Sequence, residues 1–481
     1  MKKTVILMIS LVLACSALAQ GHEHIYIFRN DNSFNTHKGA DVSSITFPKS
    51  SSMTISTTNG VAYDYSMDVV DSVVIRTTGI PEIFVTLHDY PSWTELQGAK
   101  DVVHEATLYM KGNGMYDDLE EQTVEFRGRG NSTWNMPKKP YRFKMSKKKS
   151  VCELPKAKTF ALLANFLDGT QMRNAIAMWI GRYLDMPYTN HIIPVQVYLN
   201  GNYKGLYTLT EKIGIGGGSV DIEETTGMLF ELDTNYDENY KFRYKWKNNT
   251  ESIPVMVKDP DLDELAEDAG VPGITDAAAY FSLWQADFTK MADAVTSRKA
   301  TDTLSDVIDI ESLVNYLIVY NICSNRELNH PKSVYIHKNS LDEGELYHFG
   351  PIWDFDWAFT FNGNEGAPAN VHLVTANGNA SGYAFFKLLM SNNEVKTLYK
   401  AKFDQFMADG YPQLLEFIEE YTTLAEPAAK ENGLLWPSMR YPNSYRITGS
   451  FDFRANIATL KKWLSDRIEF ISTDQNYGLY R

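Results

Sequence analysis

Two aspartates stand in an apolar stretch, Gly350 to Phe361, which reads G-P-I-W-D-F-D-W-A-F-T-F. With the alternation of a β-strand, Asp354 and Asp356 would lie on one face and the bulky aromatic residues on the other. An ionised carboxylate is costly to bury alone, so this pair indicates a metal, another cation or a network of hydrogen-bond donors beside it. An ion pair with arginine at the rim of a core explains the spacing equally well.

A third acid, Glu327, lies in the segment Asn325 to His330. A predicted amphipathic helix at 309–321 precedes this segment, and a predicted strand at 333–337 follows it before the chain reaches Asp354. Phosphotransferases place a catalytic base and a metal-binding acid in this order. Taken alone, the pattern also fits an ordinary surface acid.

A predicted β-hairpin carries a cluster of cations. Alternation over 123–129 and 138–145 places apolar residues on one side and basic residues on the other. In an acidic protein, such a face suits a ligand that bears phosphate. Lys147 to Lys149, just beyond the hairpin, are expected to be solvated surface residues. The basic residues of the hairpin are Arg127, Arg129, Lys138, Lys139, Arg142 and Lys144.

A helix is predicted to start after Asp168-Gly169-Thr170, which is typical of a cap. Arg173 falls in its first turn, where the helix dipole disfavours a cation, so a specific anionic partner is expected. A second hairpin follows at 195–210 and ends at Glu211. The strand at 228–233 is expected to complete an antiparallel sheet with these hairpins.

The N-terminus has the pattern of a secretory signal peptide over residues 1–19, with cleavage expected after Ala19. Cys15 follows an imperfect lipobox, so a lipid anchor at this cysteine is the alternative. No later apolar run reaches the roughly 20 residues that span a bilayer. Removing Lys2 and Lys3 takes the net charge from -14 to -16, which argues against nucleic-acid binding.

Strand patterns dominate the first half of the chain and helical patterns the second half, which predicts an α+β fold with two lobes. We expect a small β-repeat accessory module at 23–78. The main domain is expected at 82–481, with a β-rich lobe over about 82–258 and a helical lobe over about 259–481. A cleft between two lobes is the default place for a ligand.

Several motifs in sequence order resemble the spore-coat protein H (CotH) family. They are R-G-R-G-N-S-T-W with K-K-P-Y-R-F-K, then L-L-A-N-F-L-D-G-T-Q-M-R-N, V-Y-L-N-G-N-Y-K-G-L-Y-T-L-T-E-K-I, M-L-F-E-L-D and G-P-I-W-D-F-D-W-A-F. The resemblance runs from about Arg127 to Phe359 and is looser over the C-terminal helices. The β repeats before it resemble a module found on exported Bacteroidetes proteins.

The resemblance implies an exported atypical protein kinase with a divergent two-lobed kinase-like fold, which transfers phosphate from ATP to Ser or Thr with Mg or Mn. Asp354 and Asp356 would hold the metal, with Asp356 also counted as catalytic, and Glu327 would be the catalytic base. The family usually has Asp at that last position, and the longer Glu puts activity in doubt. The residues expected to contact ATP are Lys139, first of all, with Arg127, Arg142, Lys144, Arg173 and Glu211.

The alternative is a catalytically inactive surface or adhesion protein that keeps the fold to bind a partner or a glycan. The sequence specifies neither the acceptor protein nor the oligomeric state.

Overall fold

The computed structural model describes most of the chain. The described residues are 23–29, 34–38, 42–77, 80–89, 96, 98–246, 252–268, 274, 276–297, 303–359, 368–376, 382–436 and 453–481. The predicted signal peptide with Cys15 lies outside them, as do Thr360 and Phe361 at the end of the aspartate stretch.

The N-terminal strands form two small antiparallel sheets, ordered β2-β1-β6 and β3-β4-β5. The first half, β1 to β3, gives β1 and β2 to one sheet and β3 to the other. The second half, β4 to β6, gives β4 and β5 to one sheet and β6 to the other, as expected if the two halves are equivalent. Their shared core contains Ile25, Ile27, Met53 and Ile55. The role of an accessory module stays a prediction. The strands are β1 (Glu23–Arg29), β2 (Phe34–Lys38), β3 (Val42–Lys49), β4 (Ser52–Thr57), β5 (Ala62–Ser66) and β6 (Val70–Thr77).

Seven strands then close a barrel in the order β10-β11-β13-β12-β7-β8-β9. Their alternating apolar side chains fill its interior, as in β8, where every second residue is buried or partly buried. A short 3-10 helix, η3 (Ser132–Asn135), lies between β9 and β10. The strands are β7 (Glu82–Leu87), β8 (His104–Lys111), β9 (Leu119–Gly128), β10 (Tyr141–Lys149), β11 (Ala157–Leu163), β12 (Ile193–Leu199) and β13 (Asn202–Glu211).

The predicted basic hairpin is confirmed as β9 and β10, which pair antiparallel. Phe126 pairs with Phe143 on the face toward the barrel core, while Arg127 pairs with Arg142 on the other face. The alternation of the sequence therefore sets which side of the barrel is basic.

A second sheet has the order β15-β16-β14-β17-β18. The expectation that residues 228–233 join the preceding hairpins is wrong, because β14 pairs with β16 and β17 instead. All five residues of β14 are buried. This agrees with a run that is apolar except for Glu231, which is typical of a strand covered on both faces. The strands are β14 (Met228–Leu232), β15 (Lys241–Tyr244), β16 (Ile253–Asp259), β17 (Val334–Lys338) and β18 (His348–Phe349).

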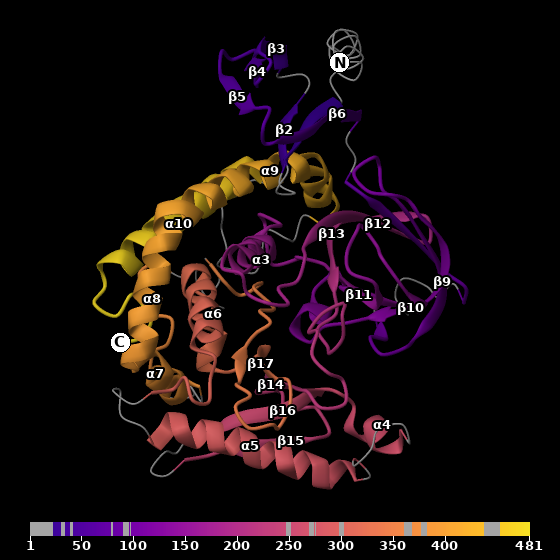
Figure 1. Ribbon diagram of the computed structural model, residues 1–481. Helices are drawn as coiled ribbons and strands as arrows, with labels where there is room; N and C mark the ends of the chain where they lie inside the picture. Colours follow the sequence, from indigo (N-terminus) through magenta and orange to yellow (C-terminus); the bar gives the residue numbers. More distant parts are fainter. Residues whose placement is uncertain are drawn as a thin grey trace.

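Helix α5 (Ala277–Ser297) runs along this sheet, after the short α4 (Leu262–Glu267), and the barrel lies apart from it across the molecule (Figure 1). Phe288 of α5 packs against Phe230 of β14. Strands from before and after residue 259 thus meet in one sheet, and the fold class is α+β.

Helix α6 (Ile310–Cys323) lies at the centre of the largest core, and every residue in it except Glu311 is buried. It confirms the helix predicted at 309–321, and Asp309 caps it by accepting a 2.6 Å hydrogen bond from the Ser312 N–H. The remaining helices are α3 (Arg173–Tyr183), η4 (Arg326–Asn329), α7 (Tyr383–Ser391), α8 (Asn393–Gln405), the π-helical η5 (Phe406–Gly410), α9 (Tyr411–Leu435) and α10 (Phe453–Thr473).

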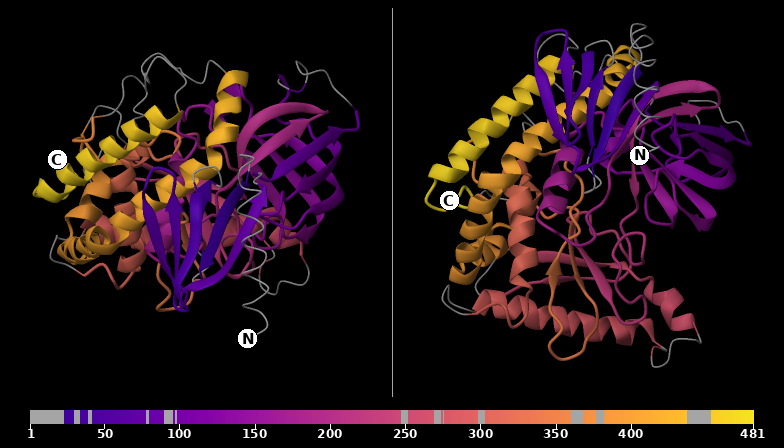
Figure 2. Two further views of the ribbon diagram at one scale, coloured as in Figure 1. Left: turned by 90° about the horizontal axis from the view of Figure 1, so that it is seen from above. Right: turned by 45° about the horizontal axis from the view of Figure 1, so that its top comes forward.

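The long helix α9 connects the parts of the molecule. The N-terminal strands lie beside it (Figure 2), and Asn35 of β2 donates a 2.6 Å hydrogen bond to Glu420. On its other side α9 packs on β13 and α3. None of the helices in the described ranges is long and apolar enough to cross a membrane.

His337 of β17 gives the fold a pH dependence. It is 3% exposed and donates from Nδ1 to the Gly350 carbonyl oxygen over 3.1 Å. Burial, aided by nearby His348, lowers its pKa from 6.5 to about 4, against smaller opposing effects of Gly350 and Asp309. His337 therefore becomes protonated near pH 6.5 in the unfolded chain but only near pH 4 in the folded protein. As the pH falls from 6.5 toward 4, this difference lowers the free energy of unfolding of the protein.

We expect His337→Gln, which keeps a donor for Gly350, to reduce that loss by about 2–3 kcal/mol between pH 7 and pH 4.5. Urea unfolding of both proteins at the two pH values measures this. Parallel pH dependences would show that His337 does not titrate in this way.

Candidate active site

A cavity of about 620 Å³ lies where the β9–η3 turn of the barrel, the second sheet and the segment after α6 meet. It brings Glu327, Asp354 and Asp356 together, as their order in the sequence predicted. Its charge is mainly acidic, with seven carboxyl groups and four cations of Lys or Arg in its lining. The acids are Glu231, Asp233, Asp237, Glu238, Glu327, Asp354 and Asp356, and the cations are Arg129, Lys258, Arg326 and Lys332.

The aspartate stretch is not a strand. Residues 350–355 have no regular secondary structure and 356–359 form a turn, so the predicted alternation is wrong. Asp354 has φ of +59°, a left-handed conformation that residues other than glycine rarely adopt. Such strain persists only where surrounding contacts impose it. Both carboxylates line the cavity nonetheless, because other elements hold this segment from outside.

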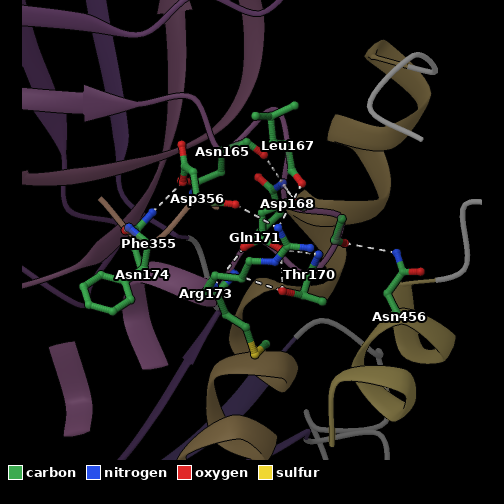
Figure 3. Close-up of polar contacts among 12 residues, drawn as sticks. Asn165, Leu167, Asp168, Thr170, Gln171, Arg173, Asn174, Phe355, Asp356 and Asn456 are labelled. Carbon is green, nitrogen blue, oxygen red and sulfur yellow. Dashed lines mark hydrogen bonds and ion pairs between the residues drawn. The ribbon is translucent and has the colours of Figure 1, made fainter. Parts of the chain in front are cut away.

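The first turn of α3 holds the aspartate segment (Figure 3). Asn174 donates a 2.7 Å hydrogen bond to Oδ1 of Asp356 and accepts a 2.9 Å hydrogen bond from the Phe355 N–H. Arg173 donates from Nη1 to the carbonyl oxygen of Asp356 over 2.9 Å. Two consecutive side chains thus fix the backbone and the side chain of Asp356 together.

Arg173 has the anionic partner that its position required, and the partner is Asp168. The Arg173 Nε and the Asp168 carboxylate are 3.6 Å apart, and both side chains are 1% exposed. Asp168 also accepts hydrogen bonds from the backbone N–H groups of Thr170 and Arg173, both at 2.8 Å. The N-cap of α3 is Met172, so the helix starts later than the cap predicted at Asp168 to Thr170, and Asp168 acts from about one turn before the helix. Arg173 lies beneath the cavity and does not line it.

Glu327 lies in the 3-10 helix η4 that directly follows α6. Asn325 accepts a 3.1 Å hydrogen bond from the Glu327 N–H and donates one of 3.2 Å to the Asp354 carbonyl oxygen. This one side chain sets Glu327 and Asp354 relative to each other. Oε2 of Glu327 is buried and accepts no hydrogen bond from any residue that the structure describes.

Burial is the main reason that the pKa values of Glu327, Asp354 and Asp356 are all raised above their usual range. The three charges also repel one another. Arg129 opposes the shift at Asp354, and Lys332 opposes it at both Asp354 and Glu327. The carboxylates therefore have less positive charge around them than their ionised forms require.

These acids fit a divalent cation. In the described part of the chain, no group of three or more His, Cys, Asp or Glu side chains is already placed to hold a metal ion. Mg²⁺, however, is commonly bound through one or two carboxylates, with water and substrate phosphates completing its shell. Asp354 and Asp356 match that donor set, and the unpartnered oxygen of Glu327 shows that the cavity is short of positive partners.

Sequence reasoning missed Lys258, which lies on β16 and lines the cavity. Its Nζ lies 2.8 Å from Glu231 Oε2 and 2.8 Å from Glu238 Oε1. The Tyr335 hydroxyl donates to the other oxygen of Glu231 over 2.9 Å. A buried carboxylate thus holds the ammonium group of a lysine at the cavity. The signal available in the sequence was the charge of Glu231 inside an otherwise apolar strand.

The residues expected to contact ATP are spread over several places. Arg127 and Arg142 line a second cavity of about 210 Å³ that adjoins the first. Lys139 donates to the carbonyl oxygen of Trp134, and Lys144 lies 3.9 Å from Glu125 on the surface; neither lines either cavity. Glu211 is buried beside His191, 2.5 Å from its Nδ1, in a separate hollow of about 230 Å³.

A comparison with protein-family models places the chain. The model described as CotH kinase protein matches residues 126–471, which is well over half of the chain. The chain therefore belongs to the CotH kinase family. No match to a curated protein was found.

The raised pKa values predict that the cavity lowers the stability of the metal-free protein. We expect Asp356→Asn to raise the free energy of unfolding by about 1–3 kcal/mol in EDTA at pH 8, because it removes one of the repelling charges. Asparagine keeps the oxygen that Asn174 contacts. Thermal unfolding by circular dichroism measures the change.

The matched control is Asn174→Ala, which leaves the charges and removes both hydrogen bonds to the aspartate segment. It should lower stability by about 1–3 kcal/mol. If Asp356→Asn lowered the stability instead, the carboxylates of Glu327, Asp354 and Asp356 would not destabilise the metal-free protein by mutual repulsion.

Proposed function

We propose that the large cavity transfers the γ-phosphate of ATP to a Ser or Thr hydroxyl of a protein acceptor, with a divalent cation. The observation that carries the proposal is the convergence of Glu327, Asp354 and Asp356 in one cavity, with a buried Glu327 oxygen that lacks a donor. Membership of a kinase family supports it. The volume of about 620 Å³ lies in the usual range for small-ligand sites.

Asp354 and Asp356 would hold the cation, which would neutralise phosphate charge when bound. Arg129, Lys258 and Lys332 are the cations of the lining that are placed to offset the remaining negative charge. The hydroxyl oxygen of the acceptor would bond to the γ-phosphorus, and Glu327 would accept the proton that this hydroxyl loses. The bond from that phosphorus to the bridging oxygen breaks, and ADP leaves with the electron pair.

The barrel and the helical region around α6 would then act as the two lobes of a kinase-like arrangement, with the cavity between them. The signal-peptide pattern supports an exported protein, and the N-terminal sheets would be its accessory module. The family usually has Asp at the position of Glu327. In this proposal, activity therefore depends on whether the longer Glu side chain can act as the base.

Binding of Mg·ATP can be tested before any acceptor is known. We expect Mg·ATP at 100 times its dissociation constant to add about 2.7 kcal/mol of stability. A shifted thermal unfolding midpoint measures it. The shift should require Mg or Mn and should disappear in Asp354→Asn. An unshifted midpoint in the wild-type protein would remove the nucleotide from the proposal and favour the inactive binding protein.

Phosphate transfer tests Glu327 itself. With casein as acceptor and labelled ATP, Glu327→Gln should lower the rate by about 10²- to 10⁴-fold, because it cannot accept a proton. Glu327→Asp should keep measurable transfer, since the carboxylate is preserved. Glu343→Gln, a matched change at an exposed acid outside the cavity, should have no effect. Equal rates for Glu327→Gln and wild type would exclude Glu327 as the base.

A further inference from the structure

The smaller cavity beside the candidate active site is built from cations. Its lining contains six Lys or Arg residues and a single acid, Asp101. We call it the arginine pocket, after Arg127, Arg129 and Arg142. The three lysines of its lining are Lys100, Lys212 and Lys258.

Two arginines of this pocket, Arg127 and Arg142, have little compensation from the chain, whereas Arg129 lies near Asp354 and Asp356. Arg127 and Arg142 face each other directly across the β9–β10 ladder, where like charges repel. Among the described residues, Arg127 forms a salt bridge only with Asp101, at 3.4 Å, and the Asp101 side chain is 76% exposed. Arg142 forms no salt bridge with any residue in the described part of the chain. Burial and then the charges of Arg127 and Arg129 lower the pKa of Arg142, against smaller opposing effects of Glu125 and Asp101. A bound anion would therefore offset the repulsion within this cluster.

The scaffold under the pocket is rigid. The opposite faces of β9 and β10 are packed in the barrel core through Phe126 and Phe143. Gly128 allows Trp134 to pack against the turn, because a Cβ there would lie 2.3 Å from its ring. The turn brings Arg129 over the ring of Trp353, 5.4 Å from the centroid. These guanidinium groups are thus positioned before any ligand arrives, which favours binding.

The arginine pocket and the large cavity are contiguous. They share the wall formed by Arg129, Gly130, Asn131, Lys258, Tyr335 and Trp353. At about 210 Å³ the arginine pocket is below the usual size of a nucleotide site, but a single carboxylate or phosphate group is far smaller. The acidic large cavity repels any anion that arrives without a metal ion, so the two cavities select different anionic groups.

We propose that the arginine pocket binds an anionic side chain of the acceptor, a carboxylate or a phosphate near the hydroxyl that is phosphorylated. This inference rests on the proposed phosphotransfer and adds the class of its substrate. The acceptor hydroxyl would enter the large cavity beside Glu327, and its acidic neighbour would reach across the shared wall. Planar guanidinium groups match carboxylate and phosphate oxygens in geometry as well as charge.

The test compares three labelled serine peptides that differ only in the residues beside the serine, which are Glu, phosphoserine or Gln. Fluorescence anisotropy measures their dissociation constants with the full-length protein, both without nucleotide and with Mg and a non-hydrolysable ATP analogue. We expect the two acidic peptides to bind at least about tenfold more tightly than the Gln peptide. The Glu and phosphoserine peptides distinguish carboxylate from phosphate recognition.

The sequence predicted that Arg142 contacts ATP, but Arg142 does not line the large cavity. Arg142→Gln should therefore abolish that preference and leave the affinity for Mg·ATP unchanged. Lys148→Gln, an exposed residue on the same strand, removes the same charge outside both cavities and should keep the preference. Arg127→Gln gives a second reading if Arg142→Gln does not fold. Equal binding of all three peptides would overturn the inference, as would a loss of Mg·ATP affinity in Arg142→Gln as large as the loss for acidic peptides.

The two proposals fail separately. If the wild-type protein binds no Mg·ATP, the phosphotransfer proposal fails, while the peptide preference without nucleotide still decides the role of the arginine pocket. If Mg·ATP binds and the peptide preference is absent, only the substrate inference fails.

Discussion

The candidate site depends on one buried ion pair, that between Asp168 and Arg173. Two charged side chains that are each 1% exposed are stable in the fold because each is close to the opposite charge and makes further hydrogen bonds. Asp168 uses its remaining hydrogen bonds to shape the turn before α3, and Arg173 uses its own to reach the backbone of Asp356. Asn174 then takes its place beside the carboxylate of Asp356. The polar turn before one helix therefore fixes a segment almost two hundred positions further along the chain.

The same principle of positioning from outside applies to the rest of the cavity. Asn325 connects η4 to the Asp354 segment, and Glu231 orients Lys258 from the neighbouring strand. Asp356, Glu327 and Lys258 are thus each supported by a neighbouring polar side chain, namely Asn174, Asn325 and Glu231. Arg129 and Trp353, whose ring it lies over, are part of the wall between the acidic large cavity and the basic arginine pocket. Regions of negative and positive potential are therefore separated by a single layer of side chains. This separation is maintained by rigid strands on one side and by the end of a buried helix on the other.

The sequence predicted the parts that follow from local periodicity. The β9–β10 hairpin, helix α6 and the α+β class follow from alternation and helical spacing. The order of Glu327 and the two aspartates along the chain was the basis for predicting that they share one site. The strand predicted through Asp354 was wrong, because its extended pattern gave no sign of the contacts that force a left-handed residue there. Arg173 carried a correct signal, an unmet need for an anion, but only the folded turn shows that Asp168 meets it. Lys258 itself carried no signal, because its role depends on which strands become neighbours. The available sign was its partner Glu231, a charge inside an otherwise apolar strand.

Lys138, in the turn before β10, is completely buried and contacts both β13 and α9. Its Nζ donates to Asn432 of α9, 294 residues later in the chain, and Asn432 also accepts the Leu206 N–H over 3.1 Å. During synthesis the barrel sequence leaves the ribosome before α9, so until α9 packs this lysine lacks Asn432 and has the Leu206 carbonyl oxygen of β13 as a partner. Contacts of such sequence separation slow folding and prolong exposure of unfinished surfaces. A barrel expressed without the C-terminal helices would therefore leave the buried groups of Lys138 and Leu206 without Asn432.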